Sequence, residues 1–200
     1  NKSADSSGSG SSSASGNLPS PKIAFSTWVG YGPLFIAKEK GYFQKYGVDP
    51  QLTIIEDESQ YANAMASNNI QGLCHVVDRE VINAAQGIPE NLVLLLDQSH
   101  GGDGIIVSKD INSIADLKGK TVALDKSTTS YFFFLTALEK NGMKESDVNI
   151  QNMAAADAGA AFVAGKIDVA VVWEPWLTNA SKRDGGHVLL SSAELPNTIV

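Results

Sequence analysis

Residues 173–176, Trp-Glu-Pro-Trp, form a compact group that could bind a small molecule. They follow residues 167–172, IDVAVV, an apolar run that predicts a buried strand. A proline suits the first turn of a helix, and a carboxylate there interacts favourably with the helix dipole. Two indoles beside a carboxylate could enclose a cation or a planar nitrogen compound. We therefore expect Trp173 and Glu174 at a ligand, with packing of both indoles into the protein as the alternative.

A second group, KSTTSY at residues 126–131, brings hydroxyls to the start of a predicted helix. Free N–H groups and hydroxyls at a helix start suit an anionic or polar head group. Ordinary capping of the helix would account for one of the hydroxyls and leave the others available. We expect Thr128, Thr129 and Tyr131 to contact a ligand.

Residues 97–103, DQSHGGD, place two acids, a serine and a histidine around a glycine pair. Two glycines let the backbone turn sharply or approach a ligand closely. A hinge alone would need the glycines but not the acids. We expect at least one of Asp97, Ser99 and Asp103 to touch a ligand.

Two further groups follow predicted strands near the N-terminus. In STWVGY, residues 26–31, Trp28 and Tyr31 could stack on a flat or cationic ligand or fill the loop, and Ser26 could bind the ligand or cap a helix. Asp78 follows the strand GLCHVV and could contact the ligand or cap the next helix. We expect Arg79 to be a solvated first-turn residue, and His75 to be a hydrogen-bonded core histidine rather than a metal ligand.

Strands and helices alternate from residue 21 onward, which predicts parallel α/β units. The expected strands are 22–26, 52–55, 72–77, 91–96, 104–107, 121–124, 148–153, 167–172 and 188–191, and the expected helices are 31–46, 59–69, 78–86, 113–117, 128–140, 156–164 and 174–183. Residues 91–96, NLVLLL, have the composition of a strand covered on both faces. Parallel sheets bind ligands beyond the carboxyl ends of their strands, so the groups above should converge on one pocket.

Composition narrows the class of protein. The 200 residues are 43% hydrophobic and 18% charged, which are values of a folded protein. A net charge of −7 argues against a nucleic-acid partner. A single cysteine, Cys74, excludes a disulfide within the chain and a zinc site built on several cysteines. No apolar run is long enough to predict a membrane-spanning helix, and we expect neither a metal nor a cofactor.

The N-terminus has the composition of a linker. Residues 1–16 contain eight serines and three glycines, too little apolar surface to offset chain entropy, so we expect a flexible tether over residues 1–20. A secreted lipoprotein, cleaved before a lipidated cysteine that would precede Asn1, would carry such a tether. An artificial linker is the alternative. A lone thiol is compatible with export.

Three stretches resemble the solute-binding proteins of ABC importers that serve nitrate, taurine, alkanesulfonates and thiamine precursors. They are STWVGYGPLFIAKEKGYF at 26–43, followed by YGVD; DLKGKTVAL at 116–124 with STTSYFFFLTAL at 127–138; and FVAGKIDVAVVWEPWL at 162–177. The resemblance extends over residues 21–200 almost continuously, with the motifs in the family's order.

The resemblance implies an α/β, two-lobed type II periplasmic-binding-protein fold with parallel-type sheets. Lobe one would begin with residues 21–105, lobe two would span 106–197, and a return crossover would begin at 198–200, leaving lobe one to be completed beyond residue 200. The implied partners are a small-molecule ligand, an ABC permease with its ATPase, and a membrane reached through a lipid anchor. The protein would lie outside the cytoplasm, as a cell-surface lipoprotein or in the periplasm.

The expected ligand follows from charge. Acids outnumber bases among the groups above: Asp78, Asp97, Asp103 and Glu174 against Arg79 and Lys126. Carboxylates that face a cleft favour a ligand that donates hydrogen bonds or carries positive charge. We expect an amine, guanidinium, urea-like or pyrimidine compound, with a sulfonate, taurine or nitrate anion as the alternative.

Two other functions fit the same resemblance. A ligand-sensing module would have the same fold and site. A thiamine-pyrimidine synthase would need a histidine with a cysteine-rich segment, whereas this chain has one cysteine and three scattered histidines. We therefore predict a binding protein and not an enzyme.

Overall fold

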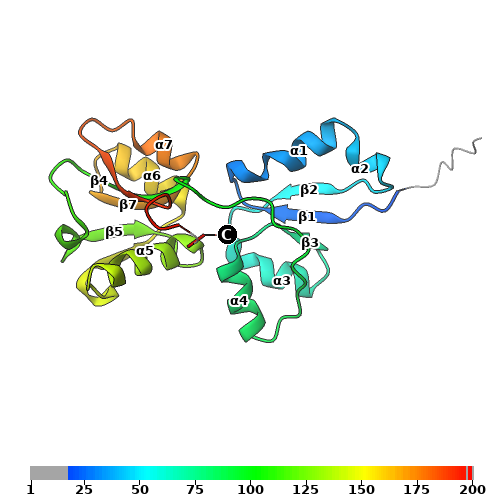
Figure 1. Cartoon of the computed structure of the whole chain (residues 1–200), viewed down its shortest axis with the longest axis horizontal. Helices are drawn as coiled ribbons and strands as arrows, with labels where there is room; N and C mark the ends of the chain where they lie inside the picture. The colour runs from blue at the N-terminus through cyan, green and yellow to red at the C-terminus, as the bar shows by residue number, and fades with distance from the viewer. Residues whose placement is uncertain (1–17, 197, 200) are drawn as a thin grey trace, which may run out of the picture.

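Lobe one is built on a small parallel sheet. The computed structural model describes residues 18–196 and 198–199, so the predicted tether lies almost wholly outside the described residues. Strands β1 (Lys22–Phe25), β2 (Gln51–Ile54) and β3 (Gly72–Leu73) pair in the order β2-β1-β3, with β1 parallel to both neighbours (Figure 1).

Short helices flank this sheet. They are η1 (Val29–Tyr31), α1 (Gly32–Glu39), α2 (Tyr42–Lys45), η2 (Glu58–Gln60), α3 (Tyr61–Ala66) and α4 (Val77–Ala85). The continuous helix expected over residues 31–46 is wrong, because the chain breaks between α1 and α2 at Gly41. Gly41 has a φ of 69°, a left-handed conformation that glycine adopts without strain.

Lobe two holds a five-stranded sheet. Strands β4 (Asp103–Val107), β5 (Thr121–Leu124), β6 (Asn149–Asn152), β7 (Val169–Trp173) and β8 (His187–Ser191) lie in the order β6-β5-β7-β4-β8. β5 runs parallel to β6 and β7, as predicted, but β4 runs antiparallel to β7 and β8. Asp103 pairs with Trp173, the last residue of β7. The chain therefore enters this lobe where β7 ends and has to run in the opposite direction.

Helices cover both faces of the second sheet. They are η3 (Ile114–Leu117), α5 (Thr129–Lys140), η4 (Glu145–Asp147), α6 (Ala155–Val163) and α7 (Trp176–Ala180). Figure 1 shows α5 on one side of this sheet and α6 and α7 on the other. Alternate residues of β4 point to opposite faces: Ile105 packs in the cluster that contains α5, and Ile106 packs in the cluster of α6 and α7. These two clusters form the main hydrophobic core of the molecule.

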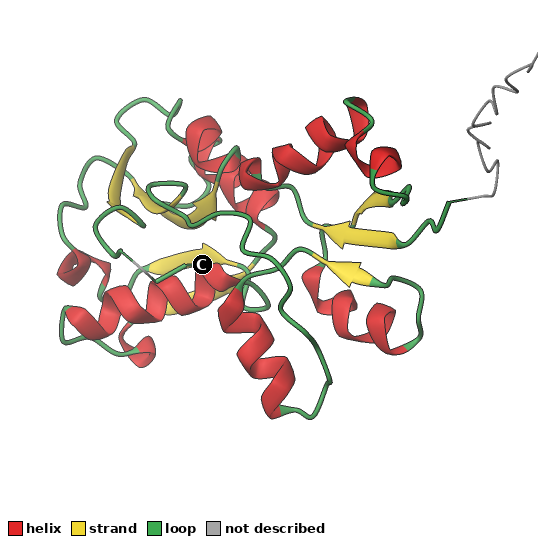
Figure 2. Ribbon diagram, turned by 45° about the vertical axis from the view of Figure 1, so that its right-hand side comes forward, coloured by secondary structure: helices red, strands yellow, loops and turns green. Residues whose placement is uncertain are grey.

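The strand predicted at residues 91–96 is wrong. This segment forms no strand, and the side chains of Leu92, Val93, Leu94 and Leu95 are 66–89% exposed. It runs as part of the long connection that follows α4 (Figure 2). Its composition suits a covered strand, but a strand also needs a hydrogen-bonded neighbour, and none of the described strands pairs with it.

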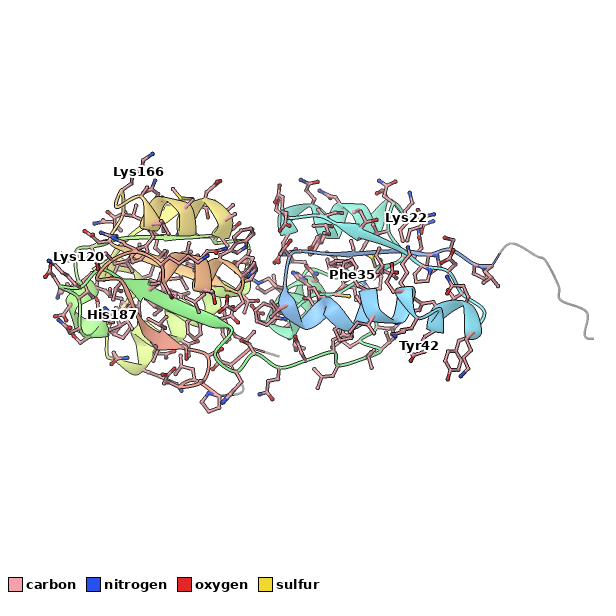
Figure 3. All side chains as sticks on the ribbon, turned by 90° about the horizontal axis from the view of Figure 1, so that it is seen from above. Lys22, Phe35, Tyr42, Lys120, Lys166 and His187 are labelled. Carbon is pink, nitrogen blue, oxygen red and sulfur yellow. The ribbon has the colours of Figure 1, made fainter. Side chains whose placement is uncertain are left out.

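The border between the lobes also differs from expectation. A division between residues 105 and 106 would cut β4, which lies wholly in the second sheet, so lobe two begins at Asp103. The chain ahead of β4 lies beside the region expected to start a return crossover, since the Ser99 N–H donates to the Ile199 carbonyl at 3.2 Å. Figure 3 shows the two halves from above: the labelled Lys22, Phe35 and Tyr42 lie in one, and Lys120, Lys166 and His187 in the other.

Candidate functional site

A cavity of about 790 Å³ lies where the lobes meet and extends into lobe one. Its wall includes Leu73 and Val76 of lobe one, the connection before β4, and in lobe two the start of α5 and the end of β7. The predicted site residues in this wall are Ser26, Trp28, Tyr31, Asp97, Ser99, Asp103, Thr128, Thr129 and Trp173. Asp78, Tyr131 and Glu174 are not part of it. Contact between any of these residues and a ligand stays a prediction.

Trp28 and Asp97 are paired at one side of the cavity. The indole Nε1 of Trp28 donates a hydrogen bond to Asp97 Oδ2 at 2.6 Å. Two glycines leave room for this pair. A Cβ on Gly30 would overlap the Asp97 carboxylate, and a Cβ on Gly102 would collide with the Trp28 ring. The sequence therefore fixes both the indole and the carboxylate at the cavity.

Asp103 is the most buried carboxylate identified in the wall, with 5% of its surface exposed. Ser99 Oγ donates to Asp103 Oδ2 at 2.5 Å and lies 2.8 Å from Ser192 Oγ. Burial raises the pKa of the Asp103 carboxyl to about 7, the Ser99 hydrogen bond opposes this rise, and the nearby Asp97 adds to it. Asp103 can therefore change its charge near neutral pH.

A partly buried network of hydrogen bonds links Ser26 to α4. Ser26 Oγ donates to Glu58 Oε1 at 2.7 Å, Glu58 Oε2 lies 3.3 Å from His75 Nε2, and His75 Nδ1 lies 2.6 Å from Glu80 Oε1. Burial acts to lower the pKa of His75, but its hydrogen bonds to the two carboxylates outweigh this effect and raise that pKa to about 9. His75 is thus a hydrogen-bonded core histidine, which confirms that prediction.

Sequence reasoning missed Glu58 as a wall residue. Glu58 follows β2, at a strand-to-helix junction like those that drew attention to Trp28 and Thr128. The same rule applied to the junction after β2 would have found it.

Contacts across the cleft join the two lobes. Thr129 Oγ1 donates to Asp78 Oδ1 at 2.7 Å, and an Arg79 guanidinium nitrogen donates to the Ser127 carbonyl at 3.3 Å. The indole of Trp173 donates to the Thr27 carbonyl at 2.9 Å.

Asp78 and Arg79 differ from their expected local roles. Asp78 is not a helix cap, because α4 begins at Val77 with Val76 at the N-cap position. Arg79 is not solvated: its side chain is 14% exposed and its Nε donates to Asp78 Oδ2 at 3.0 Å.

Tyr131 and Glu174 have partners elsewhere. The Tyr131 hydroxyl donates to Glu145 Oε2 at 2.8 Å, and Lys126 pairs with the same carboxylate. Glu174 accepts hydrogen bonds from the backbone N–H and the hydroxyl of Thr178 in α7. Both side chains therefore stabilise lobe two locally.

The start of α5 brings polar groups to the cavity, although the Thr128 and Thr129 hydroxyls already donate to the Asp125 carbonyl and to Asp78. Thr128 and Thr129 lie in the cavity wall, and the Ser130 hydroxyl is buried without a hydrogen-bond partner in the described structure. The first N–H groups of a helix have no acceptor within that helix. This helix start is suited to an anionic head group.

The wall as a whole is acidic. Its carboxylates are Glu58, Glu80, Glu90, Asp97 and Asp103, and its described part contains neither lysine nor arginine. His75 also lines the wall, and with a pKa raised to about 9 it offsets part of the charge of its partners Glu58 and Glu80. Within residues 18–196 and 198–199, no group of three or more His, Cys, Asp and Glu side chains could hold a metal ion. No helix in the same residues is long and apolar enough to cross a membrane.

Comparison with known proteins gives consistent results. Residues 28–194 match the family model described as NMT1/THI5 like. The taurine-binding periplasmic protein of Escherichia coli (strain K12) is 34% identical over 114 residues, covering 57% of this chain and 35% of that protein. The nitrate import ATP-binding protein NrtC of Synechocystis is 23% identical over 186 residues, covering 82% of this chain and 28% of that protein.

A solved structure shares the fold. The alkanesulfonate-binding protein SsuA from Xanthomonas axonopodis pv. citri, bound to MOPS, superposes with a TM-score of 0.76 at 22% identity, covering 88% of this chain and 62% of that one. This match confirms the expected two-lobed periplasmic-binding-protein fold. The chain spans 28–58% of the length of the curated relatives that it matches.

Proposed function

The chain belongs to the NMT1/THI5-like family, and from this membership we propose that it is the solute-binding part of an ABC importer. The observation that carries the proposal is the 790 Å³ cavity whose wall comes from both lobes. A solute enclosed there would contact both lobes and favour the closed form. The relative named for taurine binding and the structural neighbour named for alkanesulfonate binding support the same role.

The proposed partners are an ABC permease and its ATPase, and the relative named as a nitrate import ATP-binding protein supports this coupling. The proposed location is outside the cytoplasm, as for the periplasmic relative, with a lipid anchor on the N-terminal side as a further proposal. We propose binding without chemistry, since the relatives named above are binding or transport proteins.

We propose that an anionic head group of the solute binds at the start of α5. Thr128 and Thr129 line the cavity there, with their hydroxyls donated to the Asp125 carbonyl and to Asp78, and the buried Ser130 hydroxyl has no partner in the described structure. The N–H groups of the first helical turn, which have no acceptor within the helix, are the proposed contacts. The helix dipole favours negative charge at this end. The names of the relatives make a sulfonate the first candidate, which was the alternative in the sequence analysis.

The same solute would carry a nitrogen group that donates hydrogen bonds. Asp97 and Asp103 lie in the wall together with the indoles of Trp28 and Trp173. Carboxylates and aromatic faces both favour an ammonium group. A compact amino-sulfonate such as taurine would satisfy the acidic residues and the helix start at once.

Titration calorimetry with taurine, ethanesulfonate, ethylamine and nitrate tests the proposal. We expect taurine to bind most tightly, ethanesulfonate about tenfold more weakly, and Asp97→Asn to remove this difference. Asp157→Asn, at an exposed acid of α6, is the matched control and should preserve it. Equal binding of taurine and ethanesulfonate would exclude the nitrogen contact, and tight ethylamine binding without sulfonate binding would exclude the anionic head group.

A further inference from the structure

We propose that Asp78 and Arg79 of lobe one form a clamp on Thr129 and Ser127 of lobe two, and that these two lobe-one residues hold the lobes closed and set the affinity for solute without touching it. The proposal rests on the proposed function only in treating the cavity as the solute site. It assigns to Asp78 a positioning role in place of the ligand contact expected from the sequence.

The clamp is a connected set of hydrogen bonds centred on one carboxylate. Asp78 Oδ1 accepts from Thr129 Oγ1 of lobe two at 2.7 Å, and Oδ2 accepts from Arg79 Nε at 3.0 Å. Arg79 in turn donates to the Ser127 carbonyl of lobe two at 3.3 Å. The side chains of Asp78 and Arg79 are only 13% and 14% exposed, so solvent screens this pair less than a surface ion pair.

The placement of Asp78 explains why a carboxylate is useful here. Asp78 is the second residue of α4, and Thr129 is the first residue of α5, so the starts of two helices meet across the cleft. Each helix start carries partial positive charge, and the two would repel each other. A carboxylate between them favours their approach, and this contribution exists only while the lobes are closed.

The lobe-one side of the clamp is separate from the proposed solute contacts, whereas its partner Thr129 lies in the cavity wall. Asp78 and Arg79 are not in the cavity wall, whereas Trp173, which makes the other cross-cleft hydrogen bond, is in it. A change at Trp173 would therefore alter closure and solute contact together. A change at Asp78 isolates closure.

Closure and affinity are linked quantitatively. The apparent dissociation constant is the intrinsic constant divided by the fraction of molecules in the closed form. Loss of a charge-assisted hydrogen bond would lower the closed fraction about tenfold, given the usual strength of such bonds. The affinity of the chain for every solute would then fall by the same factor, and the ratio of the affinities for two solutes would not change.

The test combines Asp78→Asn with small-angle scattering and calorimetry on the whole chain. Without solute, the variant should have a larger radius of gyration than the unmodified chain. Its affinities for taurine and for ethanesulfonate should fall by one common factor of about ten, again from the lost bond. Asp157→Asn, a first-turn acid of α6 in lobe two, should change neither quantity.

A second variant keeps the proposal testable if Asp78→Asn folds poorly. Thr129→Val by itself removes the donor to Asp78 at similar volume, and without solute it should also have a larger radius of gyration than the unmodified chain. Unequal losses for the two solutes in Asp78→Asn, or an unchanged radius of gyration, would overturn the clamp. Failure of the unmodified chain to bind either solute, with Asp78→Asn still expanded, would overturn the proposed solute and leave the clamp standing.

Discussion

His75 Nδ1 lies 2.6 Å from a carboxylate oxygen of Glu80 in the interior of lobe one. Glu58 approaches the other ring nitrogen, and the pKa of His75 rises to about 9, although burial alone would lower it. In the unfolded chain this pKa is about 6.5. A raised pKa in the folded state contributes stability that is complete below about pH 6.5 and lost as the pH rises through about 9.

We therefore expect the free energy of unfolding to fall between pH 6.5 and pH 9, by up to about 3 kcal/mol. Urea denaturation at a series of pH values measures this change. His75→Gln should be less stable at pH 6 and should lack the fall. A histidine variant with the same pH profile as the unmodified chain would show that another group causes it.

Asp103 gives a second pH effect with a different range. Its pKa is raised to about 7 by burial, against about 3.9 in an unfolded chain. The folded state therefore holds more protons between about pH 4 and pH 7, and stability falls as the pH rises through that range. Asp103→Asn should remove the fall and be more stable at pH 8, by about 1–4 kcal/mol. Lower stability of the variant at pH 8 would mean that the charged carboxylate is itself stabilising.

Replacing Gly30 or Gly102 by alanine should disturb the Trp28–Asp97 pair and weaken solute binding. A methyl group on Gly30 displaces Asp97, and one on Gly102 displaces the Trp28 ring, so either change should separate the Trp28–Asp97 pair. We expect Gly30→Ala and Gly102→Ala to weaken taurine binding at least about tenfold, since a partly buried charge-assisted hydrogen bond is lost.

Gly32→Ala is the control for these variants, because a Cβ there has no atom within 4 Å. Calorimetry measures the affinities, and tryptophan fluorescence reports the surroundings of the indoles. Unchanged affinity in Gly30→Ala would remove the pair from the proposed site.

The two lobes should respond differently to loss of an apolar side chain. Phe134 of α5 is fully buried in lobe two, and Phe134→Ala should cost about 3–5 kcal/mol of stability. Leu94 is 74% exposed, so Leu94→Ser should leave stability nearly unchanged and reduce self-association of the chain. Denaturation and light scattering measure the two effects. A large loss of stability in Leu94→Ser would mean that this side chain is covered in solution.

Much of the architecture could be predicted from the sequence, because strand and helix periods and their alternation are local properties. The rule that ligands bind beyond the carboxyl ends of parallel strands depends on the same local patterns. It correctly placed Trp28, Asp97, Thr128 and Trp173 in the cavity wall. That rule cannot predict hydrogen bonds between side chains that are distant in the sequence and meet only in the folded chain. The Tyr131 hydroxyl bonds to Glu145, a residue of the separate element η4, and no pattern around Tyr131 indicates this.

Strand direction and pairing were also beyond local patterns. Apolar composition at residues 91–96 does not show whether a neighbouring strand is present. The apolar pattern of residues 103–107 is equally compatible with parallel and antiparallel pairing. Only the path between the lobes determines that β4 is reversed.

The reversed strand has a consequence for the order of folding during synthesis. β4 lies between β7 and β8 in the sheet, although both are made well after it. Residues 103–107 therefore leave the ribosome or the export channel before either hydrogen-bonding neighbour exists, and they are almost wholly apolar. Until β7 follows, this stretch depends on a chaperone or on transient contacts, which makes it the segment of lobe two most exposed to aggregation at that stage.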